Sequence, residues 1–384
     1  MNIKIPFGNP IFNKKTYSLV NYVLRSKKLV HGPMIEDFEK KFSTLTGANF
    51  SLGVSSCTTG MHMVYYHLGL KKGDEVIVPA QTHVATAMSV EVTGAKPIFV
   101  DSDPSTGNID VEQIEKKITK KTKVLTIVHY LGLPVEMSKI LKLAKKYKLF
   151  VLEDCALSLG SKYNNIHTGL LGDVGVFSFY PVKHITTSEG GMIITKHKKL
   201  YESLKLIRAF GVDKDYNKRS TPGEYNVIYK GINGRMSEIE AAIGVNQLEM
   251  INNFFLKRKK NFLELRNQLS SLKSISFQEP NMKMPFNWSY YCFAFILKKK
   301  IKKFRKEIID QLNAKGIGTS IYYPHPVPYM NFFKKKYRLK NRFKNAEIFS
   351  YQTIMLPIGQ HVTSKNISYI SNAVIKILKK YEND

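Results

Sequence analysis

The sequence has few cysteines and no long apolar run. Its three cysteines, Cys57, Cys155 and Cys292, are an odd number without the spacing of a metal site, which indicates a reduced, cytoplasmic chain rather than a disulfide-held one. No stretch approaches the roughly 20 apolar residues of a membrane-spanning helix. The N-terminal segment MNIKIPFGNP also lacks the apolar core of a signal peptide. We therefore expect no metal, no membrane segment and a cytoplasmic location.

Acidic residues are also scarce. The 30 Asp and Glu residues against 59 Lys and Arg residues leave a net charge of +29, which suits nucleic acid, anionic membranes or phosphorylated substrates. However, the lysines are spread along the chain in runs such as KKITKKTK and KKKIKKFRK, where amphipathic helices would turn a face to solvent. No zinc-finger, RNA-binding aromatic or basic-plus-heptad pattern is present. We therefore interpret the charge as a solvated surface and expect no nucleic-acid partner.

Apolar runs alternate with helix-like segments through much of the chain. The strand-like runs EVIVPA, KPIFVD, KVLTIVHY and LFVLEDC are separated by helical patterns at residues 58–69, 85–94, 110–118 and 136–147. This alternation predicts an α/β fold with a mostly parallel central sheet flanked by helices.

The regular alternation of strand-like and helix-like segments ends after about residue 250. Residues 251–272 read as one long helix, followed by the strand-like run YYCFAFIL, a helix in KKFRKEIIDQLNAKG, an irregular stretch and a final helix. We therefore expect a large domain over residues 1–250 and a smaller C-terminal α+β domain over residues 251–384.

One lysine stands between two apolar strand-like runs. In VFSFYPVKHITTSEGGMIIT, residues 176–195, Lys183 has aromatic residues before it and a Thr-Thr-Ser-Glu-Gly-Gly run after it. The side chain could extend to solvent from the surface, or it could be an amine that traps a carbonyl group in a pocket. Four other motifs bear on this choice.

The first motif is VLEDC. Asp154 follows a buried strand-like run, so it should lie at the carboxyl edge of the sheet, where ligands bind in open α/β folds. A carboxylate there is costly without a partner. It could be a helix N-cap, or it could pair with a pyridinium nitrogen and keep the ring of pyridoxal 5′-phosphate (PLP) electron-withdrawing.

The second and third motifs are GVSSCTTGMHMVYYHLGL and PAQTHVATA. In the second, a hydroxyl-rich turn runs into a helix, where free N–H groups with Thr58 and Thr59 would form a phosphate seat. Hydroxyl caps also open many ordinary helices. In the third, His83 follows a predicted strand and is either a loop histidine or a ring against a cofactor.

The fourth motif is GINGRMSEIEAAIGVNQLEMI. Asn233 and Arg235 precede a long helix with an apolar stripe, and Ser237 with Glu240 predicts a capping box at its start.

Together and in this order, the motifs resemble the DegT/StrS-type PLP-dependent sugar aminotransferases, which share the aspartate aminotransferase fold type. The resemblance begins at HGPMIEDFEKKFSTLTGANFSLGVSS and continues through GDEVIVPAQTHVATAMSVEVTGAKPIFVDSDPSTGNID. It then includes HYLGLPVEM, LEDCALSLGSKYNNIHTGLLGDVGVFSFYPVKHITTSEGGMI and GINGRMSEIEAAIGVNQLE. Five motifs in series cover most of the chain and make the resemblance specific.

The resemblance implies a role for each motif. Lys183 would bind PLP as a Schiff base and then carry protons, and Asp154 would pair with the pyridine nitrogen. Thr58, Thr59 and Ser178 would hold the cofactor phosphate.

Other positions either extend or depart from the family pattern. His83 occupies the position of a ring-stacking aromatic residue, and Asn233 would reach the phosphate bound by the neighbouring subunit, which implies a homodimer with shared sites. Leu157 stands where Gln or His often contacts the cofactor, so that contact is expected to be missing or replaced. Gly234 replaces a common aromatic residue, which would enlarge the substrate side.

The related 3-dehydratases of deoxysugar biosynthesis share a SFYP…HIT…EGG run but carry a histidine where the family has its lysine. Here that position is Lys183, followed by His184, so the resemblance favours transamination over dehydration.

The resemblance implies that an amino acid, L-glutamate, donates its amino group to a nucleotide-linked 4-keto-6-deoxyhexose for surface polysaccharide such as capsule or O-antigen. A small phosphorylated ketone such as dihydroxyacetone phosphate is an alternative acceptor, and a non-catalytic PLP-binding regulator or scaffold is a second alternative. Arg235 and the basic segment with Tyr322 and His325 are candidates for contacts with an anionic substrate, although that segment also fits a surface loop.

Overall fold

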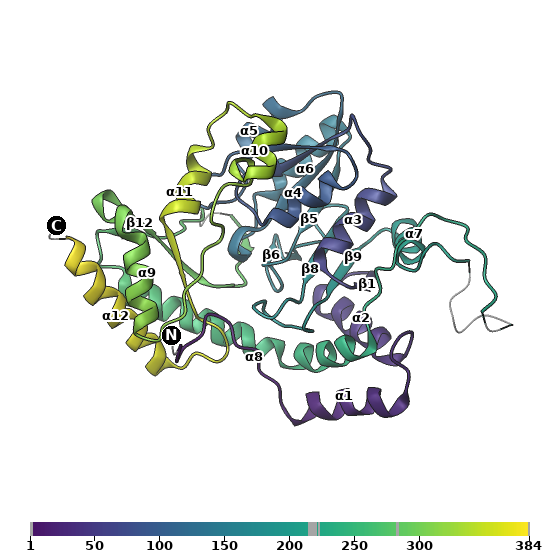
Figure 1. The fold of residues 1–384 in the computed structure, drawn as a ribbon, viewed down its shortest axis with the longest axis horizontal. Coiled ribbons are helices and arrows are strands. Elements are labelled where there is room, and N and C mark those ends of the chain that lie inside the picture. The colour runs from purple at the N-terminus through teal and green to yellow at the C-terminus, as the bar shows by residue number, and fades with distance from the viewer. Residues whose placement is uncertain (1–2, 214–220, 222, 282–283, 383–384) are drawn as a thin grey trace.

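The computed structural model describes residues 3–213, 221, 223–281 and 284–382 (Figure 1). A seven-stranded sheet forms its centre, with the strand order β1-β9-β8-β5-β4-β2-β3. Only β9 runs antiparallel to its neighbours in this sheet, which confirms the predicted mostly parallel arrangement. The strands are β1 (Phe50–Val54), β2 (Glu75–Pro79), β3 (Lys96–Val100), β4 (Thr122–Val128), β5 (Phe150–Asp154), β8 (Val174–Ser178) and β9 (Gly191–Thr195).

Helices cover both faces of the central sheet, as the alternating pattern predicts (Figure 1). One face packs against α3 (Cys57–His67), α4 (Val84–Glu91) and α7 (Lys198–Arg208) in one apolar cluster. The other face packs against α2 (Pro33–Thr46), α8 (Glu238–Leu269), α5 (Val111–Ile114) and α6 (Met137–Tyr147). The helical patterns expected at residues 58–69, 85–94, 110–118 and 136–147 therefore correspond to α3, α4, α5 with η1 (Glu115–Lys117), and α6.

Much of the chain after residue 250 forms a second group of α and β elements. A three-stranded sheet of β10 (Ile275–Ser276), β12 (Phe293–Leu297) and β13 (Thr353–Leu356) packs with α8, α9 (Arg305–Ala314) and α12 (Ser364–Glu382) in an apolar cluster of its own. The predicted C-terminal α+β texture is thus present. Helix α8 begins earlier than the expected start at 251 and passes through residue 250, so the division at that residue stays a prediction.

The start of α8 shows why it begins where it does. The Ser237 hydroxyl accepts a hydrogen bond from the Glu240 N–H, and the Glu240 carboxylate accepts one from the Ser237 N–H at 2.7 Å. This is the predicted capping box. Because 32 residues follow in one helix, α8 contributes to both large-sheet and small-sheet cores.

Shorter elements complete the described part of the chain. A three-stranded sheet joins β11 (Phe286–Asn287), β6 (Lys162–Tyr163) and β7 (Ile166–His167). The remaining helices are α1 (Lys14–Ser26), η2 (Tyr130–Gly132), η4 (Lys299–Phe304), η5 (Val327–Tyr329), α10 (Asn331–Tyr337) and α11 (Lys344–Gln352). Among the helices so described, none combines the length and apolar character that crossing a membrane requires.

Candidate active site

A pocket of about 410 Å³ lies at the carboxyl ends of β4, β5 and β8. The start of α3, the β2–α4 connection and the segment after β8 form its walls. Ligands bind at this edge of open α/β sheets, because the connections leave a crevice there. Its lining residues are Ser56, Cys57, Thr58, Met61, Thr82, His83, Ala85, Val128, Asp154, Ala156, Leu157, Ser178, Tyr180, Lys183, Glu189 and Tyr323.

Lys183 reaches this pocket from the segment between β8 and β9. Its Nζ lies 5.6 Å from the centre of the Tyr291 ring, and among the described residues it has no hydrogen-bond or ion-pair partner. Burial lowers the pKa of Lys183 below its ordinary value, although the neighbouring Cys57 and Asp154 act in the opposite direction. A lowered pKa increases the share of neutral amine at a given pH. The geometry therefore suits an amine that attacks a carbonyl group better than a lysine that extends to solvent.

Asp154 ends β5 and is 4% exposed. One carboxylate oxygen accepts a hydrogen bond from the Thr86 hydroxyl at 2.8 Å, and the other accepts one from the Ala156 N–H at 3.1 Å. No helix begins directly after β5, so the N-cap interpretation of this residue is wrong. An ionised carboxylate has about four acceptor sites, which leaves Asp154 capacity to accept a further donor from the pocket.

The start of α3 forms a second wall with hydrogen-bond donors. The Ser56 hydroxyl accepts from the Thr59 N–H at 3.0 Å and caps the helix, while Thr58 and Ser178 both line the pocket. The first N–H groups of a helix have no partner inside it and attract anions. Gly191 on β9 permits the close approach behind this turn, because a Cβ there would lie 2.6 Å from the Cys57 nitrogen.

Thr59 has a different position from Thr58. Its hydroxyl lies 3.1 Å from the Ser55 hydroxyl and 2.9 Å from the Ser56 hydroxyl, and the residue does not line the pocket. In this arrangement it completes the helix cap.

His83 lies at the entrance of the same pocket as the N-cap of α4. Its Nδ1 accepts a hydrogen bond from the Ala85 N–H at 3.2 Å, which leaves Nε2 as the protonated nitrogen of the neutral ring. Desolvation lowers the pKa of His83, and the Lys183 charge adds to this effect. The ring meets the Tyr323 ring edge-on at 5.5 Å. Its expected stacking against a cofactor stays a prediction.

Two predicted residues before α8 lie outside the pocket. Asn233 is exposed and pairs through its backbone with Ala209. The guanidinium of Arg235 lies 5.4 Å from the Phe210 ring. Neither residue lines the pocket of this single chain.

The two candidates of the basic segment also lie outside it. The Tyr322 hydroxyl lies 2.8 Å from the hydroxyl of Tyr291, whose ring in turn faces Lys183 Nζ. His325 has its Nδ1 3.2 Å from the Tyr351 hydroxyl in an exposed position. Their roles in substrate binding stay predictions.

The two departures from the family pattern have different surroundings. Leu157 lines the pocket and is buried. Gly234 does not line it; a Cβ at this position would lie 3.0 Å from the Met63 Sδ and 3.1 Å from the Thr59 Cγ2. A glycine therefore fits the tight packing against α3.

Several contacts of the site could not be predicted from the sequence. Thr86, one turn into α4, holds Asp154, and no local pattern connects the two residues. Tyr323 lines the pocket, whereas the residue predicted from the sequence was its neighbour Tyr322. The aromatic pair in SIYYP was the available signal, and only the fold shows which ring faces the cavity.

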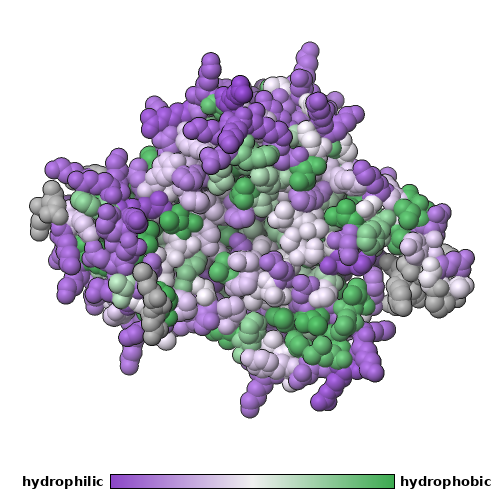
Figure 2. All heavy atoms as spheres, in the orientation of Figure 1, coloured by the Kyte–Doolittle hydropathy of each residue, from purple (hydrophilic) through white to green (hydrophobic). Residues whose placement is uncertain are grey.

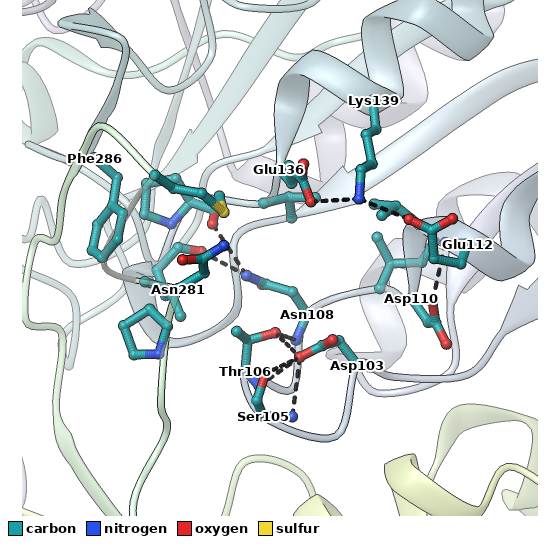
Figure 3. A pocket seen from close by; sticks show the side chains of 17 residues that line it. Asp103, Ser105, Thr106, Asn108, Asp110, Glu112, Glu136, Lys139, Asn281 and Phe286 are labelled. Atoms are coloured by element: carbon teal, nitrogen blue, oxygen red, sulfur yellow. Dashed lines mark hydrogen bonds and ion pairs between the residues drawn. The ribbon is translucent and has the colours of Figure 1, made fainter.

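A second pocket, of about 280 Å³, lies between residues 103–112, residues 133–139 and the segment before β11 (Figure 3). Its charged groups satisfy one another. Lys139 Nζ lies 2.7 Å from Glu112 Oε1 and 3.1 Å from Glu136 Oε2 (Figure 3), and these hydrogen bonds raise the pKa of Lys139. One oxygen of Asp103 accepts four hydrogen bonds from Ser105 and Thr106. This pocket therefore lacks the unpaired amine of the first one.

Within the part of the chain that the structure describes, one buried cluster has donor atoms close enough for a metal ion, namely His129, Glu153 and Cys155. Both oxygens of Glu153 already accept hydrogen bonds from backbone N–H groups of residues 169–172, and one lies 2.9 Å from His129 Nε2. Because protein donors occupy this carboxylate, its contacts fit a structural role.

Comparison with known proteins identifies the family. The model of the DegT/DnrJ/EryC1/StrS aminotransferase family matches residues 10–375. The chain belongs to this family. It is 35% identical to GDP-perosamine synthase of Escherichia coli O157:H7, over 96% of this chain and 97% of the relative. It is 31% identical to the spore coat polysaccharide biosynthesis protein SpsC of Bacillus subtilis, over 98% of this chain and 97% of the relative.

A solved structure shows the same fold. Helicobacter pylori PseC, an aminotransferase involved in the biosynthesis of pseudaminic acid, is 28% identical, with a TM-score of 0.91 over 98% of this chain and 99% of that chain. Aminotransferases of this family depend on PLP, so the chain is a PLP-dependent aminotransferase. The resemblance seen in the sequence and the predicted cofactor are thereby confirmed.

The pocket fits this cofactor on its own chemistry. It combines an unpaired amine at Lys183, a buried carboxylate with spare acceptor capacity at Asp154, and a helix N-terminus beside Thr58 and Ser178. An aldehyde, a ring nitrogen and a phosphate need these three kinds of partner.

Proposed function

We propose that this aminotransferase moves an amino group from L-glutamate to a nucleotide-linked keto-sugar, a 4-keto-6-deoxyhexose, for the biosynthesis of surface polysaccharide. The unpaired amine of Lys183, in one pocket with the buried Asp154 carboxylate, carries the proposal. A scaffold without catalytic function would gain nothing from a desolvated amine that has no hydrogen-bond or ion-pair partner among the described residues, since desolvation of an amine is costly.

The residues of the pocket have different roles in this reaction. Lys183 would hold the cofactor covalently and, once its amine is free, would take the proton from the substrate carbon that bears nitrogen onto its own Nζ and give it up again. Asp154 would hold a proton on the ring nitrogen, and Thr58 and Ser178 with the N–H groups of α3 would bind the phosphate. PLP supplies an electron sink for the carbanion that transamination requires. The apolar Leu157 wall excludes water from one side.

The relatives support a nucleotide-linked acceptor over a small phosphorylated ketone. One relative is named GDP-perosamine synthase, a second is named for spore coat polysaccharide biosynthesis, and the structural neighbour PseC belongs to pseudaminic acid biosynthesis. All three names point to sugar acceptors. Surface side chains such as Arg235 and His325 are then candidates for contacts with the nucleotide part, away from the cofactor pocket.

A half-reaction screen tests the proposal. The holoenzyme is first converted by L-glutamate, which removes the visible absorbance of the lysine-bound cofactor. GDP- and UDP-linked 4-keto-6-deoxyhexoses and dihydroxyacetone phosphate are then added separately. We expect a nucleotide-linked sugar to restore the absorbance and to yield an amino-sugar by mass spectrometry. Restoration by dihydroxyacetone phosphate alone would contradict the proposed acceptor, and no response to any amino acid would contradict the enzyme activity.

We further propose a homodimer in which Asn233 completes the phosphate site of the neighbouring subunit. Asn233 is exposed in the single chain, and apolar side chains are exposed on α1, including Tyr17 at 61% and Tyr22 at 53%. Figure 2 shows hydrophobic side chains gathered near the place that α1 occupies in Figure 1, and smaller hydrophobic patches elsewhere on the same face. Exposed apolar patches of this kind are typical of association surfaces.

Sedimentation with quantified cofactor content tests the shared site. We expect a dimer, and we expect Asn233→Asp to weaken PLP binding without changing the sedimentation coefficient, because a carboxylate repels the phosphate. A monomer that retains full cofactor occupancy would contradict the shared site.

A further inference from the structure

The ring that faces Lys183 belongs to a residue that lies outside the described pocket. Tyr291 precedes β12 in the C-terminal part of the chain and is 1% exposed. Its ring centre is 5.6 Å from Lys183 Nζ, within the distance at which the face of an aromatic ring attracts a cation. Because the amine has no hydrogen-bond partner among the described residues, this ring face is a contact that can stabilise it when it is charged.

Other contacts hold the Tyr291 ring in place. The buried Arg258 on α8 donates a hydrogen bond to the Tyr291 carbonyl oxygen at 2.6 Å. The Tyr291 hydroxyl lies 2.8 Å from the Tyr322 hydroxyl, and the Tyr322 carbonyl oxygen accepts a hydrogen bond from Gln81 Nε2 at 2.8 Å. The His184 ring packs at 5.5 Å from the Tyr291 ring. Backbone, hydroxyl and ring are therefore each fixed by a different element.

We propose that Tyr291 is a positioning residue whose ring face is the resting place of the Lys183 amine whenever that amine is not bonded to the cofactor. The inference rests on the proposed role of Lys183 as the cofactor-binding lysine. A released lysine has four rotatable bonds, so an ammonium without a partner would lose its position beside the substrate. The ring stabilises the charged amine without accepting its proton, which leaves that proton available for return to the substrate.

Several groups besides Tyr291 face the amine and set the background of its titration. Burial lowers the pKa of Lys183, while Cys57 on α3, Asp154 on β5 and Cys292 beside Tyr291 act to raise it. Desolvation lowers the pKa of His83 at the start of α4 and of His184 in the adjoining segment, and the Lys183 charge adds to this effect. A variant at position 291 changes none of these groups, so its effect on the titration reports on the ring.

The test uses the full-length enzyme loaded with pyridoxamine 5′-phosphate, which leaves the Lys183 amine unbonded. The pH dependence of acetylation of Lys183 by acetic anhydride is measured by peptide mass spectrometry, with the exposed Lys139 as an internal control. Position 291 carries Tyr, Phe, or phenylalanine with increasing fluorine substitution, which weakens the negative ring face while nearly preserving its shape.

We expect Phe to leave the midpoint of Lys183 labelling close to that of the wild type. Full fluorination should lower the midpoint by about one pH unit, a tenfold change in the protonation equilibrium. Because the fluorinated rings keep the packing of the core, the result does not depend on the folding of a truncated variant such as Tyr291→Leu.

Two outcomes would overturn the inference. One is a midpoint that does not change with fluorination. The other is an equal change in Tyr291→Phe and Tyr322→Phe, since this would assign the effect to the hydroxyl pair instead of the ring. Failure of the underlying function is recognised separately: borohydride reduction of the wild-type PLP enzyme would then place the cofactor on a lysine other than Lys183.

Discussion

Lys139 and Lys183 are two lysines beside two pockets of one molecule, and their surroundings are opposite. Lys139 is about half exposed and bridges Glu112 and Glu136, whose hydrogen bonds raise its pKa (Figure 3). Lys183 lies among buried, mostly uncharged groups, and burial lowers its pKa. The two pockets have volumes of about 280 and 410 Å³, and the pairing of the lysine amine distinguishes their chemistry.

The difference shows how a protein with an excess of cations keeps one of them reactive. A lysine with two carboxylate partners stays charged and non-nucleophilic, whereas a buried lysine without such partners exists more often as the neutral amine. Asp154 acts to raise the pKa of Lys183, but burial has the larger effect and lowers it. The reactivity of Lys183 therefore depends on burial of its amine without a carboxylate, among the described residues, that hydrogen-bonds to it.

The largest expected effect is that of Lys183→Ala. We expect loss of measurable turnover, because neither the covalent attachment nor the proton transfer has a substitute in the pocket. The fold should survive, since the side chain ends in a cavity and has no hydrogen bond to lose. Turnover and circular dichroism are measured together, and Lys139→Ala is the matched control. Transamination that persists in Lys183→Ala would assign the chemistry to another residue.

Asp154→Asn should have the second largest effect. The amide keeps the shape of the side chain but removes the charge that protonates the ring nitrogen, and loss of such an electrostatic partner costs about 10²–10³-fold in kcat. PLP should still bind through Lys183 and the α3 donors. Asp103→Asn in the second pocket is the control, since Asp103 is also hydrogen-bonded but lies apart from the amine. Equal kcat values in the two variants would remove Asp154 from its proposed role.

The pH dependence of stability gives a smaller, directional test. Because the pKa of Lys183 is lowered by folding, the unfolded chain binds more protons than the folded chain between this lowered pKa and the ordinary value of Lys. Stability should therefore rise with pH in that window, and Lys183→Met should weaken the rise. Urea unfolding of the cofactor-free chain at several pH values from 7 to 10 measures the slope. A steeper slope in Lys183→Met than in the wild type would contradict the direction of the shift.

The sequence was sufficient for the parts of the site that depend on local order along the chain. Asp154 and Ser178 end strands, and Thr58 opens a helix, so their places at one sheet edge follow from the α/β pattern. Thr86, Tyr291 and Tyr323 could not be found in this way. They reach the site through packing between distant segments, and no period or motif in the sequence records which segments meet.

The division between domains shows the same limit for the fold. The change of texture near residue 250 predicted the C-terminal α+β layer, and this layer is present. Yet α8 continues through that position, because its capping box at Ser237 starts a helix whose apolar stripe serves two cores. The pattern of residues along the chain reflects local composition, whereas a few hydrogen bonds at the start of the helix set its boundary.

The smallest expected effect belongs to Lys139→Met. Its two ion pairs are solvent-exposed, with 49% of the lysine side chain accessible, and such pairs are worth about 0–1 kcal/mol. The free energy of unfolding should fall by no more than this amount, and less at high salt, because screening already weakens the pairs. kcat and KM should stay within error of the wild type, because the residues that line the second pocket do not line the first. A change in kcat larger than about threefold, or more than ~0.6 kcal/mol in activation free energy, would mean that the second pocket is coupled to the first. In that case Lys139 would not be an inert counterpart of Lys183.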